Sequence, residues 1–404
     1  MSPLPAPRFL DATTPPHVFT LTFVAAAATL SMNVFLPSLP GMALYFEVDY
    51  RVVQLSVALY LCMNALMQIV VGPISDRFGR RRVILAGFAI YILATLGCIA
   101  APSIEVFLSF RMLQAAVVVG VVLSRAAIRD MVPGDRAASM IGYVTMGMSI
   151  IPMIGPSIGG ILDQSFGWKA NFWLQAGAGL AAMLLTWRDL GETVTPRPGG
   201  FRAQFQAYPS LLTSPRFWGY CLSAALTSGA FFAYLGGAPF VGSMIYDMSP
   251  ARLGLFFGAP AAGYLVGNFI SGRFSTRIGM TRMVLWGAII TAAGLLMSVA
   301  LFLLGLGSEY VFFGFMTWVG MGNGMTLPNA TAGMMSVRPE LAGSASGLGG
   351  ALNIGGGAAL SAFAGWLLVP GSTALPLLLL MLASSLLAVV SILFVILRER
   401  RLGL

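Results

Sequence analysis

Residues 72–82 read Gly-Pro-Ile-Ser-Asp-Arg-Phe-Gly-Arg-Arg-Arg, with one acid and four arginines between two long apolar runs. The runs at 52–74 and 83–101 are each long enough to cross a hydrocarbon core of about 30 Å as helices that rise about 1.5 Å per residue. A segment this polar predicts a tight turn at the membrane surface. We expect Gly72 and Gly79 to reverse the chain, and the arginines to contact anionic headgroups or acids on neighbouring helices.

The composition places the whole chain among polytopic membrane proteins. Of its 404 residues, 57% are hydrophobic and only 9% are charged, and the mean hydropathy is +0.85, whereas charged residues make up about 25% of soluble domains. The net charge of +9 does not indicate nucleic-acid binding, because the basic residues are scattered singly or in short clusters between apolar runs.

The sequence indicates no metal site, cofactor site or enzymatic site. Cys62, Cys98 and Cys221 lie inside apolar runs without the spacing of metal ligands, so they are interpreted as small buried hydrophobic residues. The chain has one histidine and no recognisable pair of nucleophile and base, which argues against a membrane-embedded enzyme or receptor.

The apolar runs predict the fold class. They number twelve, six on each side of a polar stretch at 189–215. We therefore predict an all-α membrane protein with twelve transmembrane helices in two pseudo-symmetric six-helix bundles, at 1–188 and 216–404, joined by a cytoplasmic linker at 189–215. The runs lie at approximately 17–46, 52–75, 82–101, 104–129, 137–161, 170–188, 216–245, 251–272, 282–305, 310–337, 341–367 and 373–397.

The distribution of arginine predicts the orientation of the chain. If the N-terminus lies inside the cell, all but four of the 23 basic residues fall at or near the cytoplasmic side. The exceptions are Arg51, Lys169 and Arg252 on the outer side and Arg111 within a span. Because Lys and Arg are enriched on the cytoplasmic side, we expect both termini in the cytoplasm and the protein in the cell inner membrane.

A short internal match predicts that the two halves are related. Ser75-Asp-Arg-Phe78 follows the second run, and Ser271-Gly-Arg-Phe274 follows the eighth, which is the second run of the later half. Parallel six-helix halves with a substrate site between them near the midplane are a recurring transporter architecture. In this alignment Gly272 stands where Asp76 stands in the first half, so the second copy of the motif is expected to lack its acid.

Several motifs together resemble the major facilitator superfamily. Residues 72–82 resemble its loop between helices 2 and 3, and Arg111-Met-Leu-Gln114 resembles its fourth-helix motif, with Ala115 in place of the usual glycine. Gly147 together with Gly155-Pro-Ser-Ile-Gly-Gly160 resembles the fifth-helix motif of drug:proton antiporters.

Two further segments narrow this resemblance to the Bcr/CflA (bicyclomycin and chloramphenicol resistance) exporters. These are Leu36-Pro-Ser-Leu-Pro40 near the end of the first run and Arg125-Ala-Ala-Ile-Arg-Asp130 at the end of the fourth. The resemblance implies the two-bundle fold, export of drug-like compounds and no cofactor.

The resemblance implies a conformational latch at the turn. Asp76 would cap the start of the eleventh helix when the transporter faces outward, and Arg80 would pair with Asp130. Static topology signalling by the same charges remains the alternative. The latch residues are Gly72, Asp76, Arg77, Gly79, Arg80, Arg129 and Asp130.

The fifth-helix motif implies a tight seam between the halves. Small residues allow a neighbouring backbone to approach closely, and Pro152 and Pro156 are expected to bend the helix. The implied partner is the eleventh helix, with Gly355, Gly356 and Gly357, although general small-residue packing would leave the same pattern. The motif residues are Gly147, Gly155, Pro156, Gly159 and Gly160.

Arg111 and the polar residues of the apolar runs are the candidates for a substrate cavity. An intramembrane arginine costs at least ~2.5 kcal/mol unless it faces water or a partner, so we expect Arg111, with Gln114 one turn further on, to face the cavity; snorkelling to the interface is the alternative. Tyr60, Asn64 and Gln68 are spaced by four and predict one polar stripe. The other candidates are Asn33, Met146, Phe232, Tyr234, Tyr264, Asn268, Asn329 and Asn353.

The coupling ion is less clearly indicated. In the resembling exporters an aspartate commonly precedes the Leu-Pro pair by three residues, and Asn33, which cannot titrate, stands there in this chain. None of the fourteen acids is expected at the midplane. Asp130 or Asp163 could serve from the cavity rims, and His17 could titrate near neutral pH, although it more simply caps the start of a helix.

Two functions follow from these expectations. The first is a monomeric secondary transporter that exports small amphipathic, drug-like compounds by alternating access, with the small molecule, protons and the lipid bilayer as its partners. The second is an exporter or facilitator of one endogenous neutral or anionic metabolite, without carboxylate-based proton coupling. Asn33 favours the second and the fifth-helix motif favours the first.

Overall fold

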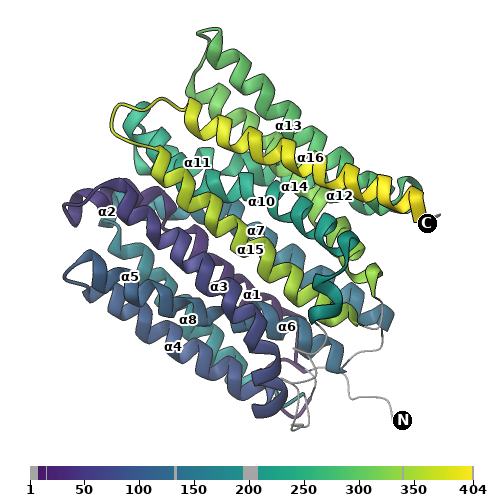
Figure 1. Ribbon diagram of the computed structural model, residues 1–404. Helices are drawn as coiled ribbons and strands as arrows, with labels where there is room; N and C mark the ends of the chain where they lie inside the picture. The colour runs from purple at the N-terminus through teal and green to yellow at the C-terminus, as the bar shows by residue number, and fades with distance from the viewer. Residues whose placement is uncertain (1–7, 15, 132–133, 194–207, 339–340, 403–404) are drawn as a thin grey trace.

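The computed structural model is helical, without strands, over the residues that it describes, which are all except 1–7, 15, 132–133, 194–207, 339–340 and 403–404. The side chains of several residues between 134 and 153, and of 342–343, also lie outside the description. The helices form two groups that lie side by side, one from each half of the chain (Figure 1).

The first group follows the predicted runs closely. It comprises α1 Val18–Asn33 with η1 Leu36–Ser38 and α2 Leu39–Tyr45, α3 Tyr50–Phe78, α4 Arg80–Ala100, α5 Ile104–Leu113 with η2 Gln114–Val117 and α6 Val118–Met131, α7 Gly134–Phe166, and α8 Lys169–Asp189.

The second group repeats this arrangement. It comprises α10 Pro215–Phe240 with η3 Val241–Ile245, α11 Pro250–Phe256 with α12 Gly258–Ile278, α13 Met280–Leu303, α14 Glu309–Val337, α15 Ala342–Leu367, and α16 Leu375–Leu402.

The lengths of the helices fit a membrane protein. Among the described residues, eight helical segments are long and apolar enough to cross a membrane. The four other long helices, α7, α8, α14 and α15, have 33, 21, 29 and 26 residues and lie in the same bundle. The described part of the chain is therefore consistent with twelve crossings.

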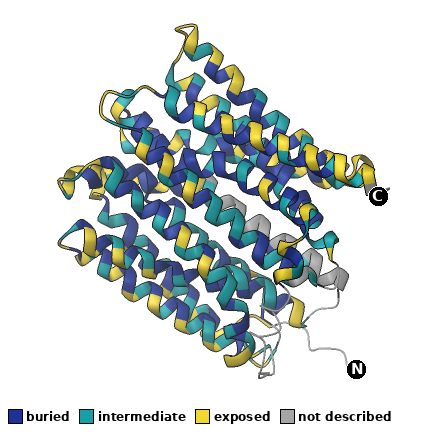
Figure 2. Ribbon diagram, in the orientation of Figure 1, coloured by how far each residue is buried: buried dark blue, intermediate teal, exposed yellow. Residues whose placement is uncertain are grey.

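Large apolar side chains on the outside of the bundle provide the surface that lipid requires. Leu386, Val390, Leu393 and Leu397 are exposed on α16 at a spacing that puts them on one helix face. Figure 2 shows further exposed positions along the outward faces of α4 and α13, which include Leu93 and Trp286. A surface this apolar is stable in hydrocarbon and would aggregate in water.

Side-chain caps explain several helix starts. The hydroxyl oxygens of Ser214, Ser249 and Ser308 accept hydrogen bonds from backbone N–H groups in the first turns of α10, α11 and α14. His17 caps α1, because its Nδ1 accepts from the N–H of Phe19 at 3.2 Å. The capping role expected for His17 is therefore present.

The turn that follows α3 is shorter than predicted. Residues 72–78 continue α3, with Pro73 inside the helix, and α4 begins at Arg80. Gly79 alone reverses the chain, with φ +94°, in a region that non-glycine residues rarely adopt. The expectation that Gly72 also shapes the turn is wrong, because α3 and α4 extend beyond the predicted limits of the apolar runs.

The same turn recurs in the second half and corrects the predicted internal alignment. Gly279 lies between α12 and α13 with φ +91°, and its N–H donates to Ser275 O at 2.9 Å, as the N–H of Gly79 does to Ser75 O. The structural counterpart of Asp76 is therefore Thr276, and Gly272 lies one helical turn earlier. The sequence match was shifted by four residues, although the acid is indeed missing from the second copy.

The packing of the core is different at the two ends of the bundle. Both chain ends lie at one end, called the termini end below, and α2 and α11 lie at the opposite, distal end (Figure 1). One buried apolar cluster draws on both halves and contains Phe35 and Leu253. Two other clusters hold buried residues of one half each, around Phe88 in the first and Tyr220 in the second. The buried residues of the two halves thus form one core on the distal side and separate cores on the termini side, where the partly buried Ile69 of α3 packs against the second-half cluster.

Buried and partly buried hydrogen bonds join the halves on the distal side. The hydroxyl of Tyr50 donates to Gly236 O at 2.7 Å, and Nε2 of Gln54 donates to Ser361 O at 2.6 Å. The hydroxyl of Ser157 donates to Gly254 O at 3.0 Å. These contacts place α3 against α10 and α15, and α7 against α11, so they close the distal side.

Candidate functional site

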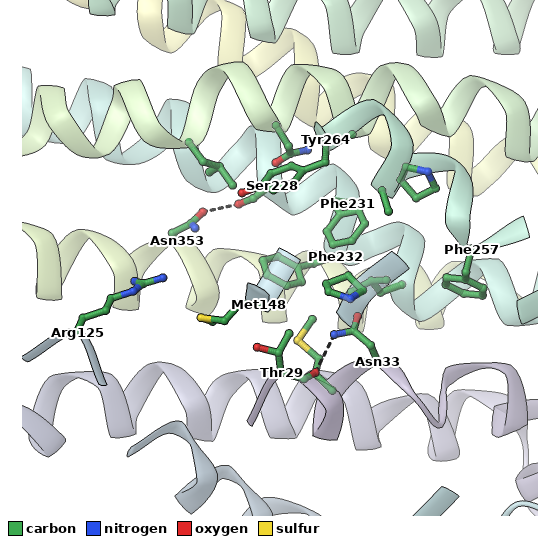
Figure 3. Close-up of a pocket in the computed structure, with 18 residues that line it drawn as sticks. Thr29, Asn33, Arg125, Met148, Ser228, Phe231, Phe232, Phe257, Tyr264 and Asn353 are labelled. Carbon is green, nitrogen blue, oxygen red and sulfur yellow. Dashed lines mark hydrogen bonds between the residues drawn. The ribbon is translucent and has the colours of Figure 1, made fainter. Parts of the chain in front are cut away.

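A cavity of about 270 Å³ lies between the two halves. Side chains from α1, α6 and α7 line it on one side, and side chains from α10, α12, α14 and α15 line it on the other. Figure 3 shows aromatic rings along most of its length and a few polar groups at intervals. Ligand sites in helical proteins commonly have this character, with an apolar wall and few polar groups.

Four of the predicted cavity residues line this space, namely Asn33, Phe232, Tyr264 and Asn353. Asn33 is buried, and its Nδ2 donates to Thr29 O at 2.9 Å. Asn353 Oδ1 accepts a short hydrogen bond from the hydroxyl of Ser228 (Figure 3). Each of these two amides therefore uses one of its polar atoms in a hydrogen bond within the protein, and its other polar atom is left for a ligand.

Other predicted residues lie away from the cavity. Tyr234 is fully buried among Phe257, Phe312 and Phe313. Asn268 Nδ2 donates to Tyr264 O, and Asn329 Nδ2 donates to the hydroxyl of Ser271 at 2.7 Å. The side chains of Met146 and Gly147 are outside the described residues.

The three residues of the predicted polar stripe on α3, Tyr60, Asn64 and Gln68, do not share one environment. Gln68 Nε2 donates to Asn64 Oδ1 at 2.9 Å, and a Cβ on Gly350 of α15 would lie 3.0 Å from Gln68 Oε1. Tyr60 instead packs on the guanidinium of Arg111 inside the first half. None of the three lines the cavity between the halves.

Arg111 is enclosed within the first half, which corrects the expectation that it faces the cavity. The side chain is fully buried and is not among the cavity residues. Its guanidinium carbon lies 4.3 Å from the ring centre of Phe35 and 4.1 Å from that of Tyr60. Two aromatic faces and a set of hydrogen bonds therefore take the place of water around this cation.

The hydrogen bonds of Arg111 join three segments of the first half. Nη2 donates to Ser31 O at 2.9 Å, Nη1 to Gln114 Oε1 at 2.6 Å, and Nε more weakly to Ser56 O at 3.4 Å. Gln114 in turn donates to the hydroxyl of Thr95 at 2.7 Å. The pairing of Arg111 with Gln114 is present, but it links α1, α3, α4 and η2 and does not present a charge to the cavity.

The predicted latch residues meet at the termini end. Arg80 Nε lies 3.0 Å from Asp130 Oδ2, and Arg80 Nη2 lies 2.7 Å from Asp76 Oδ1. The pair expected between Arg80 and Asp130 is therefore present, but Asp76 also binds Arg80. The N-cap position of α15 is Leu341, and no side chain caps it. Arg77 packs on Phe78, and Arg129 is exposed.

Glu192 also contacts this cluster, and the sequence did not single it out. Its Oε1 accepts a hydrogen bond from the backbone N–H of Arg80 at 2.7 Å, at the N-terminus of α4, where an acid is favoured. A Cβ on Gly79 would collide with this carboxylate. The segment after α8 therefore packs on the turn at Gly79.

The glycines of the fifth-helix motif have different neighbours. A Cβ on Gly159 would fall on Val34 O, within the first half, whereas one on Gly160 would fall on Pro250 O at the start of α11. Gly155 has no neighbour closer than 3.7 Å. The seam between the halves thus runs against α11, and the partner expected in α15 packs on α3.

Some cavity residues were not predicted. Arg125 and Met148 line the cavity from the first half, and Ser228 and Phe257 line it from the second. Arg125 lies in the segment that narrowed the resemblance, so its polarity was a usable signal, whereas Phe257 has no feature that separates it from other aromatic residues. No Asp or Glu side chain of the described residues lines the cavity.

Comparisons with known proteins agree with this architecture. The family model of the Major Facilitator Superfamily matches residues 21–362. A solved structure of a bacterial homolog to the human lysosomal transporter Spinster, in an inward-facing and occupied conformation, superposes with a TM-score of 0.69 at 17% identity, covering 95% of this chain and 96% of that one. At this identity the likeness supports the fold alone.

Sequence relatives include transporters with resistance names. The chain is 32% identical over 262 residues to the uncharacterized MFS-type transporter YdgK of Bacillus subtilis, covering 63% of this chain and 65% of that protein. It is 32% identical over 253 residues to a chloramphenicol resistance protein of Pseudomonas aeruginosa, covering 62% and 59%. It is 29% identical over 358 residues to multidrug resistance protein D of Escherichia coli, covering 85% and 87%. The first two matches span less than two thirds of the relatives' own length.

Proposed function

This chain belongs to the Major Facilitator Superfamily, and from that premise we propose that it exports small amphipathic, drug-like compounds across the cell inner membrane by alternating access. It is a multi-pass membrane transporter and not an enzyme. Its two bundles, at 1–188 and 216–404 with the linker between them, are proposed to move as units, in a monomer whose termini both lie in the cytoplasm.

The observation that carries this proposal is a cavity between two halves that share a core on one side only. Buried contacts such as Tyr50 to Gly236 and Gln54 to Ser361 hold the distal side shut. On the termini side the buried cores are separate and, among the described residues, only the partly buried Ile69 is seen to pack against the cluster of the other half, so that side would part more easily. We therefore interpret this arrangement as the inward-facing state, which exchanges with an outward-facing state when the two halves rock about the cavity.

The lining of the cavity supports amphipathic substrates. Phe231, Phe232 and Phe257, with Met32 and Met148, supply adaptable apolar contact. The names of the relatives from Pseudomonas aeruginosa and Escherichia coli refer to chloramphenicol and multidrug resistance, which supports drug export as the first candidate.

The absence of a cavity carboxylate among the described residues favours the second candidate. A proton antiporter commonly uses a partly buried carboxylate whose pKa changes between states, and here Asn33 occupies the cavity wall instead. Transport of one neutral or anionic metabolite without carboxylate-based coupling therefore stays open. Coupling to protons is the part of the first proposal that most needs measurement.

We expect expression of the full chain in an efflux-deficient bacterium to raise the inhibitory concentration of several amphipathic antibiotics. In inverted membrane vesicles, the same compounds should accumulate while a pH gradient is maintained and should stop accumulating when an ionophore collapses it. Continued uphill transport without the gradient would show that protons are not the coupling ion. If no drug is exported and a metabolite is, the second candidate is correct.

We also propose that the cluster of Asp76, Arg80 and Asp130 is one arm of the conformational latch. In the present state Asp76 binds Arg80, and the first turn of α15 lacks a side-chain cap. On opening of the distal side, Asp76 would leave Arg80 and cap α15, where a carboxylate typically contributes about 0.5–2 kcal/mol. Thr276, its counterpart in the second half, carries no charge, so the latch is one-sided.

The latch predicts that Asp76→Ala, which removes both the proposed cap and the bond to Arg80, lowers the rate of export about tenfold while the amount of protein in the membrane stays unchanged. Export in vesicles and immunoblotting of the membrane fraction would measure these two quantities. Asp247→Asn, which removes an exposed acid at the distal end, is the matched control and should transport normally. Normal export by the Asp76 variant would leave only the topology role for this charge.

A further inference from the structure

Arg125 is a charged cavity residue whose bonding is incomplete. It lies on α6, two turns before the helix ends at Met131, and it lines the cavity. Figure 3 shows its guanidinium directed into the space, on the side where Asn353 and Ser228 lie. Its Nε is buried and has no hydrogen-bond partner, and the hydrogen bonds and ion pairs of the described residues include none from Arg125.

The neighbouring charges do not neutralise Arg125. The phenol of Tyr264 has an electrostatic effect on it, and Arg129, one turn further along α6, carries the same charge. Asp130, the acid nearest to Arg125 in the sequence, forms an ion pair with Arg80. Because no Asp or Glu side chain of the described residues lines the cavity, this space carries a net positive charge.

Arg111 shows which contacts a fully buried guanidinium makes in this fold. All three nitrogens of Arg111 donate hydrogen bonds, and aromatic rings cover both faces of its guanidinium. A partly buried cation without such partners is costly in a membrane protein and commonly marks a path or a site for a charged ligand. Arg125 has the exposure to the cavity that Arg111 lacks.

The charge of Arg125 lies at one end of the cavity, and the most apolar part of the cavity lies at the other end. Ser228, on the side of Arg125, and Leu235 both line the cavity on α10, and seven residues of helix extend about 10 Å. Figure 3 shows Arg125 and Phe257 at opposite ends, with Phe231 and Phe232 between them. A ligand that fills the space would therefore place a charged group at one end and an apolar or aromatic body at the other.

We propose that Arg125 forms an anion subsite, with Asn353 and Ser228 as neighbouring polar groups, and that the substrates are small amphipathic anions with a carboxylate, sulfonate or phosphate group. This inference rests on the proposed transport function and adds the charge of the substrate to it. A guanidinium in a low-dielectric cavity pairs strongly with such a group and repels amphipathic cations.

The test uses two fluorescent probes with the same aromatic body, dansylglycine, which is anionic, and dansylglycinamide, which is neutral. Binding of each to the purified full-length protein in detergent would be measured by fluorescence titration. We expect the anion to bind wild type about tenfold or more tightly than the amide, and Arg125→Gln to remove this preference. Arg125→Lys should keep part of it, and Arg273→Gln, an exposed arginine near the end of α12, should keep all of it.

The outcomes separate this inference from the transport proposal. Equal binding of both probes by wild type, no binding of either, or an anion preference that survives in Arg125→Gln would each overturn the anion subsite, whatever compounds the cells export. Retained binding of the amide by the Gln variant shows that this variant is folded. If the anion preference behaves as expected but vesicles transport nothing, the subsite stands and the transport proposal fails.

Discussion

Gly160→Ala should reduce export by about tenfold or more while the protein remains in the membrane in normal amount. The added methyl group would fall on the carbonyl oxygen of Pro250 and lie 2.7 Å from its carbonyl carbon. These are backbone atoms at the start of α11, so they cannot rotate away as a side chain could. The two halves must separate to admit the methyl group, and overpacking of this kind costs about 1–3 kcal/mol.

The cost falls on one conformation, which is why the expected effect on transport is large. In the proposed alternating-access cycle, Gly160 would face the other half only where the distal side is closed. In the present structure Gly254 of α11 makes the reciprocal close approach to Pro156. Destabilising this state by about 1.4 kcal/mol changes its population relative to the outward-facing state about tenfold. Export in vesicles would measure the rate, and hydrogen exchange of the α11 amides would measure opening of the distal side.

Gly155→Ala on the same helix is the matched control. Its new methyl group would have no neighbour nearer than 3.7 Å, which is ordinary van der Waals contact, and alanine is the better helix former. We therefore expect it to assemble and to keep α11 protected. Equal loss of export in the two variants would mean that the motif acts by something other than close approach of the halves.

Arg111→Lys is expected to destabilise the first half by about 3 kcal/mol or more. A lysine ammonium is a compact donor that lacks the planar fork of the guanidinium, so it cannot reach Ser31, Ser56 and Gln114 together. Each buried acceptor left without a donor costs about 1–3 kcal/mol. The stacking of the guanidinium on the rings of Phe35 and Tyr60 is lost as well. Thermal unfolding of the purified protein in detergent should show a midpoint several degrees below that of wild type.

Arg188→Lys provides the comparison, because Arg188 is exposed at the end of α8 and its guanidinium lies 6.0 Å from the ring centre of Trp187. Its midpoint should match that of wild type. If Arg111→Lys unfolds like wild type yet no longer exports, then Arg111 acts directly on a substrate or proton and the packing role argued from its contacts is wrong.

The fold could be predicted from sequence because its signals are local. The apolar runs that bracket residues 72–82 had to be helices of a certain length, since a bilayer leaves no other way to satisfy backbone hydrogen bonds. The limits of the prediction were equally local. The turn is Gly79 alone because α3 and α4 extend beyond the predicted apolar runs. Only the positive φ of Gly79, shared with Gly279, identified the true register of the repeat.

The candidate site was predicted in part. Asn33 and Asn353 line the cavity as expected, since an amide on an apolar helix is costly anywhere except in the protein interior. The rule that an intramembrane charge needs a partner applied equally to Arg111 and Arg125, and it could not say which of them would find its partners inside one bundle. That depends on how each helix is rotated about its axis, and rotation is determined by contacts between distant segments.

The sequence by itself determined that this is a helical membrane transporter of two six-helix halves with a charged segment at residues 72–82, because hydrophobicity, charge and motif spacing can each be recognised within one stretch of chain. Only the tertiary structure decided that the halves meet on the distal side, that Arg111 is enclosed and that Arg125 faces the cavity. These features depend on close packing between helices far apart in sequence, where a single glycine such as Gly160 decides whether two backbones can touch.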